Sequence, residues 1–314
     1  MNRRSFAKDL TGALGAAAFG GNRFLDAGVS AGTSAATPWH SGDGEAPGVP
    51  FKLSVMLWTV FTNLPFGQRL EKVAEAGYKN VELVGEYRHW SAAEFKSAMN
   101  KRRELGIHFD TTAGLDHGIG KPAERDALLA DLRHELPIME RIEAPAIIIM
   151  SGNVVPGLSR QAQHESCVEG LKRAAELVDG KTIAGQPIRL LLENIDPEEN
   201  PKYYLQSVAE GFQIVREVGH PQVQFLYDFF HEQIAEGNLI EKLEKNVDKL
   251  GLCHIADVPG RHEPGTGEIN YANIFKSLAR HGFSHYVAME YLPTYDAVTS
   301  LRAEREKALR AAQT

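Results

Sequence analysis

Short apolar segments alternate with amphipathic stretches along the chain from Phe51 onward. Several segments, such as Ile147-Ile148-Ile149, are apolar without interruption, as in a parallel strand that is covered on both faces. We therefore predict β-strands at residues 52–59, 80–84, 108–112, 146–150, 189–193, 224–228, 251–256 and 286–291.

The stretches between these segments have the spacing of helices. Ser91 and Glu94 form a Ser-x-x-Glu capping box, apolar residues follow at helical spacing, and Gly106 marks the end of the helix. Two further stretches place apolar residues on one helical face: Val168, Leu171, Ala175 and Val178, and then Leu239, Leu243, Val247 and Leu250.

Eight strands that are each followed by a helical stretch predict a single (β/α)8 barrel over residues 51–314. The main alternative, an open doubly wound sheet, usually carries a glycine-rich phosphate-binding turn after its first strand. Residues 58–62 read WTVFT and contain no glycine, which favours the closed barrel.

The first fifty residues have a different character. Arg3 and Arg4 precede a mildly apolar segment, residues 10–21, that is too short and too rich in glycine to span a bilayer. This order predicts a twin-arginine export signal over residues 1–36 and a periplasmic or exported protein; the alternative is a frayed basic terminus. Residues 37–50 are rich in Gly, Ser, Ala and Pro and predict a flexible linker. We expect no membrane span in the mature protein.

Composition narrows the functional classes. The formal net charge of −7 provides no basic surface, so we expect no nucleic-acid partner. The two cysteines, Cys167 and Cys253, are too few for a disulfide framework, and we expect both to be buried apolar residues. The sequence leaves open whether the chain forms a homo-oligomer.

Each of the last four predicted strands carries an ionisable residue near its carboxyl end, at a position that can face the barrel axis. These residues are Glu193, Asp228, His254 and Glu290. Side chains alternate along a strand, so all four can point toward the barrel axis at the carboxyl ends of their strands. Three carboxylates crowded together require a counter-charge, and an oxygen-rich set with one imidazole suits Mn²⁺ or Mg²⁺, with Co²⁺ or Zn²⁺ as alternatives. Taken singly, each residue has a structural alternative: a core histidine, a helix cap or half of an ion pair.

Four segments resemble a known family: LLENID, YDFFHEQIAEGNL, HIADVPGRHEPGTGEINY and VAMEY. They are similar to the hydroxypyruvate isomerase branch of the xylose isomerase-like TIM barrels, over the chain from Phe51 to the eighth strand. The resemblance implies that Glu193, Asp228, His254 and Glu290 hold a divalent metal. The third ligand is often Gln in this branch and His in ketose 3-epimerases, so both substrate classes stay open.

The resemblance implies proton transfer beside a carbonyl group. We predict that Glu193 and Glu290 act as the acid and base while also binding the metal, and that an enediolate forms. The substrate is a small hydroxy-carbonyl compound or sugar, as in the isomerisation of hydroxypyruvate to tartronate semialdehyde. The alternatives are a ketose 3-epimerase, another sugar isomerase, an exported sugar- or metal-binding protein, and an abasic-site endonuclease, which the acidic charge disfavours.

Further residues are predicted to contact the substrate. They are His231, Arg261, Glu199 and His108, with Trp58 and Phe66 as apolar walls. Some have structural alternatives: His231 as a helix cap, Arg261 in an ion pair with Glu263, Glu199 at a solvated helix start, and His108 in the core.

Overall fold

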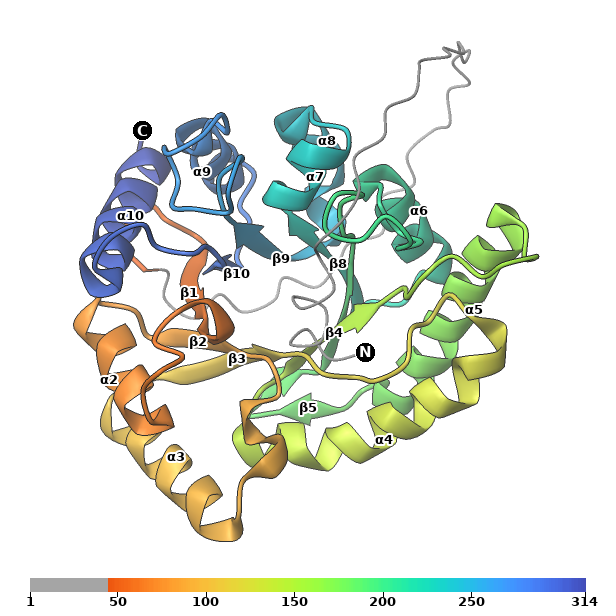
Figure 1. Ribbon diagram of the computed structural model, residues 1–314, viewed down its shortest axis with the longest axis horizontal. Coiled ribbons are helices and arrows are strands. Elements are labelled where there is room, and N and C mark those ends of the chain that lie inside the picture. The colour runs from red at the N-terminus through yellow and green to blue at the C-terminus, as the bar shows by residue number, and fades with distance from the viewer. Residues whose placement is uncertain (1–44) are drawn as a thin grey trace.

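The computed structural model describes residues 45–314, and in it eight parallel strands close into a barrel (Figure 1). Around the ring the order is β1-β10-β9-β8-β7-β4-β3-β2. The strands are β1 (Lys52–Met56), β2 (Asn80–Leu83), β3 (His108–Thr112), β4 (Ala146–Met150), β7 (Arg189–Glu193), β8 (Val223–Asp228), β9 (Leu250–Ile255) and β10 (Tyr286–Met289). The predicted (β/α)8 barrel is confirmed.

Helices surround the strands (Figure 1). The α-helices are α2 (Phe66–Glu75), α3 (Ala92–Glu104), α4 (Arg125–Ile142), α5 (Arg160–Val178), α6 (Val208–Val218), α7 (Phe229–Ala235), α8 (Leu239–Asn246), α9 (Tyr271–Arg280) and α10 (Ala297–Ala312). The short 3-10 helices of residues 45–314 are η1 (Leu57–Thr59), η2 (Glu86–His89), η3 (Pro122–Glu124) and η4 (Val247–Lys249). The capping box predicted at Ser91 and Glu94 forms at the start of α3.

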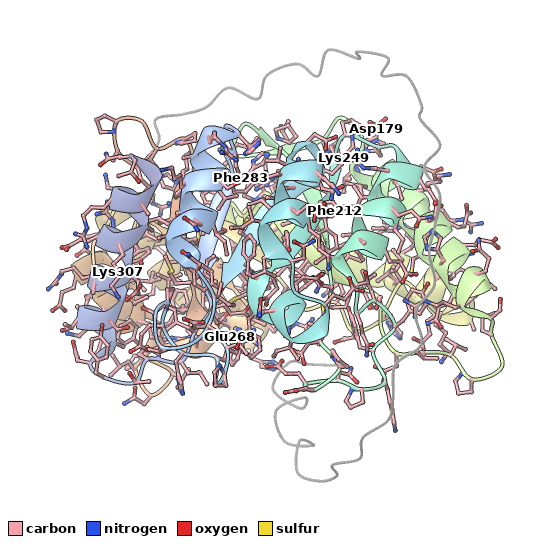
Figure 2. The ribbon with its side chains drawn as sticks, turned by 90° about the horizontal axis from the view of Figure 1, so that it is seen from above. Asp179, Phe212, Lys249, Glu268, Phe283 and Lys307 are labelled. Carbon is pink, nitrogen blue, oxygen red and sulfur yellow. The ribbon has the colours of Figure 1, made fainter. Side chains whose placement is uncertain are left out.

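The two ends of the barrel carry different loops. Figure 2 shows the barrel from the side, with Asp179 and Lys249, which precede strands, toward one end and Glu268, in the loop after β9, toward the other. The loops that follow strands therefore gather at one end, which is the end where (β/α)8 barrels carry their active sites.

Some element boundaries differ from the prediction. The first strand ends at Met56, because residues 57–59 turn into η1, and the last ends at Met289 rather than at residue 291. A short antiparallel hairpin, β5 (Thr182–Ile183) and β6 (Gln186–Pro187), was not predicted. Its turn residues Ala184 and Gly185 both have positive φ, which suits a tight hairpin, but two-residue strands leave no alternation to detect.

Residues 45–50, which were predicted to belong to a flexible linker, contact the barrel. Glu45 accepts a hydrogen bond from the backbone N–H of Leu53 at 3.2 Å and pairs with Arg305 of α10 at 3.1 Å. Val49 is buried. Residues 45–50 thus pack onto the barrel, whereas the predicted export signal over residues 1–36 and the rest of the predicted linker, residues 37–44, lie outside the described residues. Within residues 45–314, no helix is long and apolar enough to cross a membrane.

Apolar side chains fill both the space under the helices and the barrel interior. Interior residues such as Leu191, Leu226 and Leu252 are fully buried. They have the same parity as Glu193, Asp228 and His254, so the apolar interior continues directly into the ionisable residues at the strand ends. Cys167 and Cys253 are buried free thiols, as expected.

Helix α6 lies so close to β8 that one position has no room for a side chain. A Cβ atom at Gly211 would lie 2.1 Å from Cε2 of Phe225. We predict that Gly211→Ala lowers the free energy of unfolding by about 1–3 kcal/mol, because the added methyl overpacks this contact. Urea denaturation followed by circular dichroism measures the change.

Gly67 in α2 provides the matched control, because a Cβ atom there would meet only Lys101 at 3.7 Å. Gly67→Ala should change the free energy of unfolding by less than about 1 kcal/mol. Equal effects of the two substitutions would contradict the packing argument.

Candidate metal and active site

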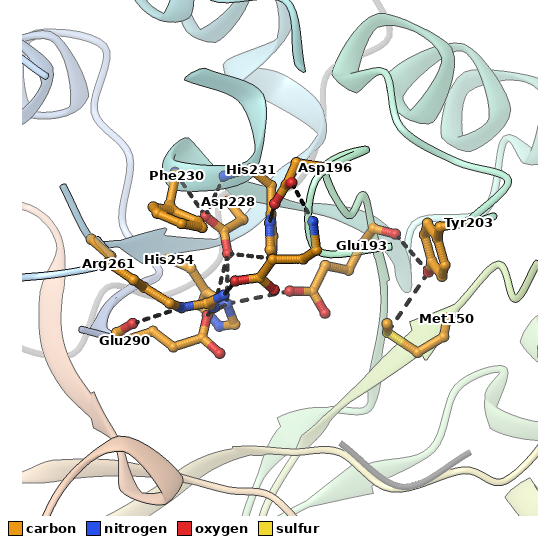
Figure 3. A network of polar contacts seen from close by, with 12 residues as sticks. Met150, Glu193, Asp196, Tyr203, Asp228, Phe230, His231, His254, Arg261 and Glu290 are labelled. Carbon is orange, nitrogen blue, oxygen red and sulfur yellow. Dashed lines mark hydrogen bonds and ion pairs between the residues drawn. The ribbon is translucent and has the colours of Figure 1, made fainter. Parts of the chain in front are cut away.

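Four ionisable side chains meet at the carboxyl ends of adjacent strands (Figure 3). They are Glu193 at the end of β7, Asp228 at the end of β8, His254 in β9 and Glu290 directly after β10. All four are buried, and each offers one ligand atom within 4.8 Å of the others. The structure therefore brings together the residues that the sequence predicted to face one another.

The imidazole of His254 lies at the centre of this cluster. Its Nδ1 is 2.6 Å from Oε2 of Glu290 and 3.5 Å from Oε1 of Glu193. Its Nε2 is 2.9 Å from Oε2 of Glu82, a fully buried residue of β2. Burial lowers the pKa of His254, but the carboxylates of Glu290 and Glu82 outweigh burial and raise it well above its ordinary value.

Asp228 serves the helix and the cluster at once. Its Oδ1 accepts hydrogen bonds from the N–H groups of Phe230 and His231 and so caps α7. Its Oδ2 points into the cluster, 3.8 Å from Nδ1 of His254. The helix-cap alternative for Asp228 is thus correct for one oxygen, and it leaves the other oxygen for the site. Burial raises the pKa of this carboxyl group, while His231 opposes the increase.

His231 connects Asp228 to a second carboxylate. Its Nδ1 lies 2.5 Å from Oδ2 of Asp196, and its Nε2 lies 3.3 Å from Oδ2 of Asp228. Burial disfavours the charged ring, but Asp228 and the hydrogen bond to Asp196 raise the pKa of His231 to about 9. His231 borders the cavity above the cluster.

Arg261 closes the cluster from the loop after β9. Its guanidinium is 2.7 Å from Oε1 of Glu199 and 2.9 Å from Oε2 of Glu290. It also lies over the rings of Trp58 and Phe230. The alternative partner, Glu263, instead accepts hydrogen bonds from the backbone N–H and hydroxyl of Thr294. Arg261 is therefore held at the site rather than at the surface.

Asp257 organises the loop that carries Arg261. Its carboxylate accepts hydrogen bonds from the backbone N–H groups of Val258, Gly265, Gly267 and Ile269 at 2.9, 2.7, 3.0 and 3.0 Å. Arg261 has a φ of 57°, an unusual backbone angle for a side chain of this size. A fixed loop is what keeps the arginine in this conformation.

A cavity of about 660 Å³ opens over the cluster. Trp58, Glu199, His231, Arg261 and Glu290 line the part near the cluster. The far part is lined by the segments after β3 and β4, among them His117, Lys121 and Asn153. Nε1 of Trp58 donates to Oε1 of Glu290 at 2.9 Å, so the predicted wall also contacts a cluster residue.

Two predicted contact residues lie elsewhere. His108, predicted to contact the substrate, is exposed at the amino end of β3 and is not part of the cavity wall. Parity indicates which face of the sheet a residue takes, but not how far along the barrel axis it lies. Phe66 is also absent from the wall, because its ring packs against Trp90 and Phe109.

Two further residues of the site, Glu82 and Asp196, were not predicted from the sequence. Glu82 is the one charged residue in the segment NVELV, with the parity that faces the barrel axis, and the parity argument used for the later strands applies to it equally. Asp196 follows Glu193 in the segment LLENID, where no strand parity assigns a direction.

Comparisons with known proteins agree with this architecture. A family model described as "Xylose isomerase-like TIM barrel" matches residues 70–312. A 2-oxo-tetronate isomerase of Haemophilus influenzae is 32% identical over 255 residues, which are 80% of this chain and 96% of the relative. A hydroxypyruvate isomerase of Escherichia coli is 30% identical over 261 residues, covering 80% of this chain and 97% of the relative.

Solved structures share the fold. A structure described as an AP endonuclease, family 2, from Brucella melitensis has a TM-score of 0.70 and 25% identity and covers 80% of this chain and 96% of its own. A D-psicose 3-epimerase with D-tagatose, from Clostridium cellulolyticum H10, has a TM-score of 0.66 and 18% identity and covers 84% and 96%.

We predict that Asp257→Ala lowers the free energy of unfolding by about 2–4 kcal/mol, because one buried and three partly buried N–H groups of the loop lose their acceptor. Hydrogen exchange at Gly265, Gly267 and Ile269 should accelerate. Asp296→Ala is the control: this exposed cap of α10 bonds to Thr299 and should cost about 1 kcal/mol. Unchanged exchange in the loop of the Asp257 variant would show that the carboxylate does not order it.

Proposed function

Because the chain belongs to the xylose isomerase-like TIM barrel family, we propose that it is a metal-dependent isomerase of a small hydroxy-carbonyl compound. Relatives named as isomerases of 2-oxo-tetronate and of hydroxypyruvate match most of the chain. The observation that carries the proposal is the buried cluster of Glu193, Asp228, His254 and Glu290.

The donor set fits a divalent cation. Three carboxylate oxygens and one imidazole nitrogen lie within 4.8 Å of one another. Opposite ligands of a small divalent ion are about 4.2 Å apart at ligand distances of 2.0–2.1 Å, so modest side-chain shifts complete the site. Oxygen-rich sets with one nitrogen favour Mn²⁺ or Mg²⁺, and Co²⁺ or Zn²⁺ are compatible with the same residues.

When bound, the cation supplies a Lewis acid that polarises the substrate carbonyl and stabilises negative charge on the enediolate. Glu193 and Glu290 carry out the proton transfer in this proposal. Their strands, β7 and β10, are separated by β8 and β9 in the ring, so the two carboxylates reach a bound substrate from different directions. One removes a proton from the hydroxyl-bearing carbon, the other returns a proton to the former carbonyl carbon, and the proton of the original hydroxyl group passes to the former carbonyl oxygen.

His231, Arg261 and Glu199 are proposed to hold the substrate. Arg261 presents a fixed fork of N–H donors toward the cluster, which suits a carboxylate or two adjacent oxygens of the substrate. Glu199 and His231 border the same part of the cavity and can accept from or donate to hydroxyl groups.

A ketose 3-epimerase is the second candidate, and two observations favour it. The third donor of the cluster is His254, and the cavity of about 660 Å³ has room for more than a three-carbon substrate. The same glutamates then remove and return a proton at a single carbon from opposite faces. A sugar- or metal-binding protein without turnover does not need two glutamates beside the cation.

We predict that the metal-loaded protein converts hydroxypyruvate or 2-oxo-tetronate, and that a chelator stops the conversion. The assay measures loss of substrate with Mn²⁺ or Mg²⁺, and a panel of free ketoses is tested in parallel. Turnover of ketoses alone would assign the protein to the epimerase class. Absence of turnover with the metal bound would favour the binding protein.

We predict that Glu193→Gln and Glu290→Gln each lower kcat by about 100-fold or more, because an amide cannot exchange the transferred proton. Glu304→Gln is the control, since Glu304 is equally buried but lies in α10 and pairs with Lys307. Circular dichroism checks that each variant folds. An active Glu290→Gln protein would refute its role as acid or base.

A further inference from the structure

A buried carboxylate contacts the cluster from the other side of the barrel. Glu82 belongs to β2, and His254 belongs to β9, with β1 and β10 between them in the ring. Both side chains have no exposed surface, and Oε2 of Glu82 lies 2.9 Å from Nε2 of His254. The contact therefore crosses the barrel interior and reaches a residue of the cluster.

The two nitrogens of His254 face different surroundings. Nδ1 faces Glu290 and Glu193 in the cluster, whereas Nε2 faces Glu82. An imidazole that donates its Nδ1 lone pair to a metal must carry its hydrogen on Nε2, and a buried N–H needs an acceptor. Glu82 is the acceptor at that position.

We propose that Glu82 is a positioning residue that accepts the Nε2–H of His254 and thereby aims Nδ1 into the cluster. The inference rests on the metal site of the proposed function. It adds a residue of the opposite barrel wall to the four that the parity argument identified. Partners of this kind fix the ring orientation of a metal-binding histidine and increase its affinity for the metal.

The surroundings of Glu82 support a dedicated role. Its other oxygen, Oε1, is buried and has no hydrogen-bond partner among residues 45–314. The nearby carboxylate of Asp110 is instead hydrogen-bonded to the hydroxyl of Ser54 at 2.5 Å. A fully buried carboxylate is costly unless it is well paired, and the pairing of Glu82 is with the histidine of the cluster.

The test compares metal binding among four variants, with activity left aside. Glu82→Ala and Glu82→Met remove the acceptor, and Met also preserves most of the side-chain volume. Glu82→Gln keeps an oxygen that can accept from Nε2–H. Asp110→Ala is the matched control, because it removes a buried carboxylate from the barrel interior that bonds to Ser54 and not to a cluster residue.

Calorimetric titration of each chelator-treated full-length protein with Mn²⁺ and Co²⁺ gives the affinity, and the visible absorption of bound Co²⁺ reports the ligand geometry. We expect Glu82→Ala and Glu82→Met to bind about 10- to 100-fold more weakly and to show an altered Co²⁺ spectrum. Glu82→Gln and Asp110→Ala should stay close to the unmodified protein in both measurements.

Unchanged affinity and spectrum in the Ala and Met variants would overturn the proposal while leaving the proposed function intact. An equal loss in Asp110→Ala would also overturn it, because the effect would then follow from any buried carboxylate. Equal losses in Glu82→Gln and Glu82→Ala would exclude the acceptor role. If the unmodified protein binds neither metal, both this inference and the metal-dependent function fail.

Discussion

The crowding of like charges in a buried site is the constraint on which this structure depends. Glu193, Asp228 and Glu290 are almost completely buried within a few ångströms of one another. Such an arrangement persists only with compensating positive charge. His254 and Arg261 provide that charge from within the chain, and a divalent cation held by the same carboxylates would provide it during catalysis. The strand ends, the cap of α7 and the loop after β9 together hold the negative and positive groups in contact.

The same side chains stabilise the fold and form the site. Asp228 caps α7 with one oxygen and faces the cluster with the other, and Glu290 accepts from Trp58 while it contacts His254 and Arg261. A side chain that makes contacts in two directions at once has little freedom to rotate. This restriction is a form of preorganisation, in which the fold itself positions the side chains of the site.

Local alternation in the sequence was enough to predict the barrel and the four clustered residues, because parity and strand ends depend only on neighbouring positions. Contacts between distant residues were not predictable in this way. Glu82 meets His254 across the barrel, and Glu45 meets Arg305 at the end of the chain. His108 has the parity that was predicted but lies at the wrong end of β3. The partner of Arg261 depends on a loop conformation that Asp257 sets through hydrogen bonds to backbone groups eight to twelve residues away.

Glu45 and Arg305 hold the first described residues against the last helix, and Gln313 reaches the carbonyl of Pro47 at 3.1 Å. A short peptide can therefore connect residue 314 to residue 45. The barrel would then be closed by a covalent link between its ends as well as by the hydrogen bonds of its sheet. The chain could then begin at a different element and still form the same barrel. A circular permutant opened between Ala184 and Gly185, in the exposed hairpin on the side remote from the cluster, would encode the same barrel with new ends.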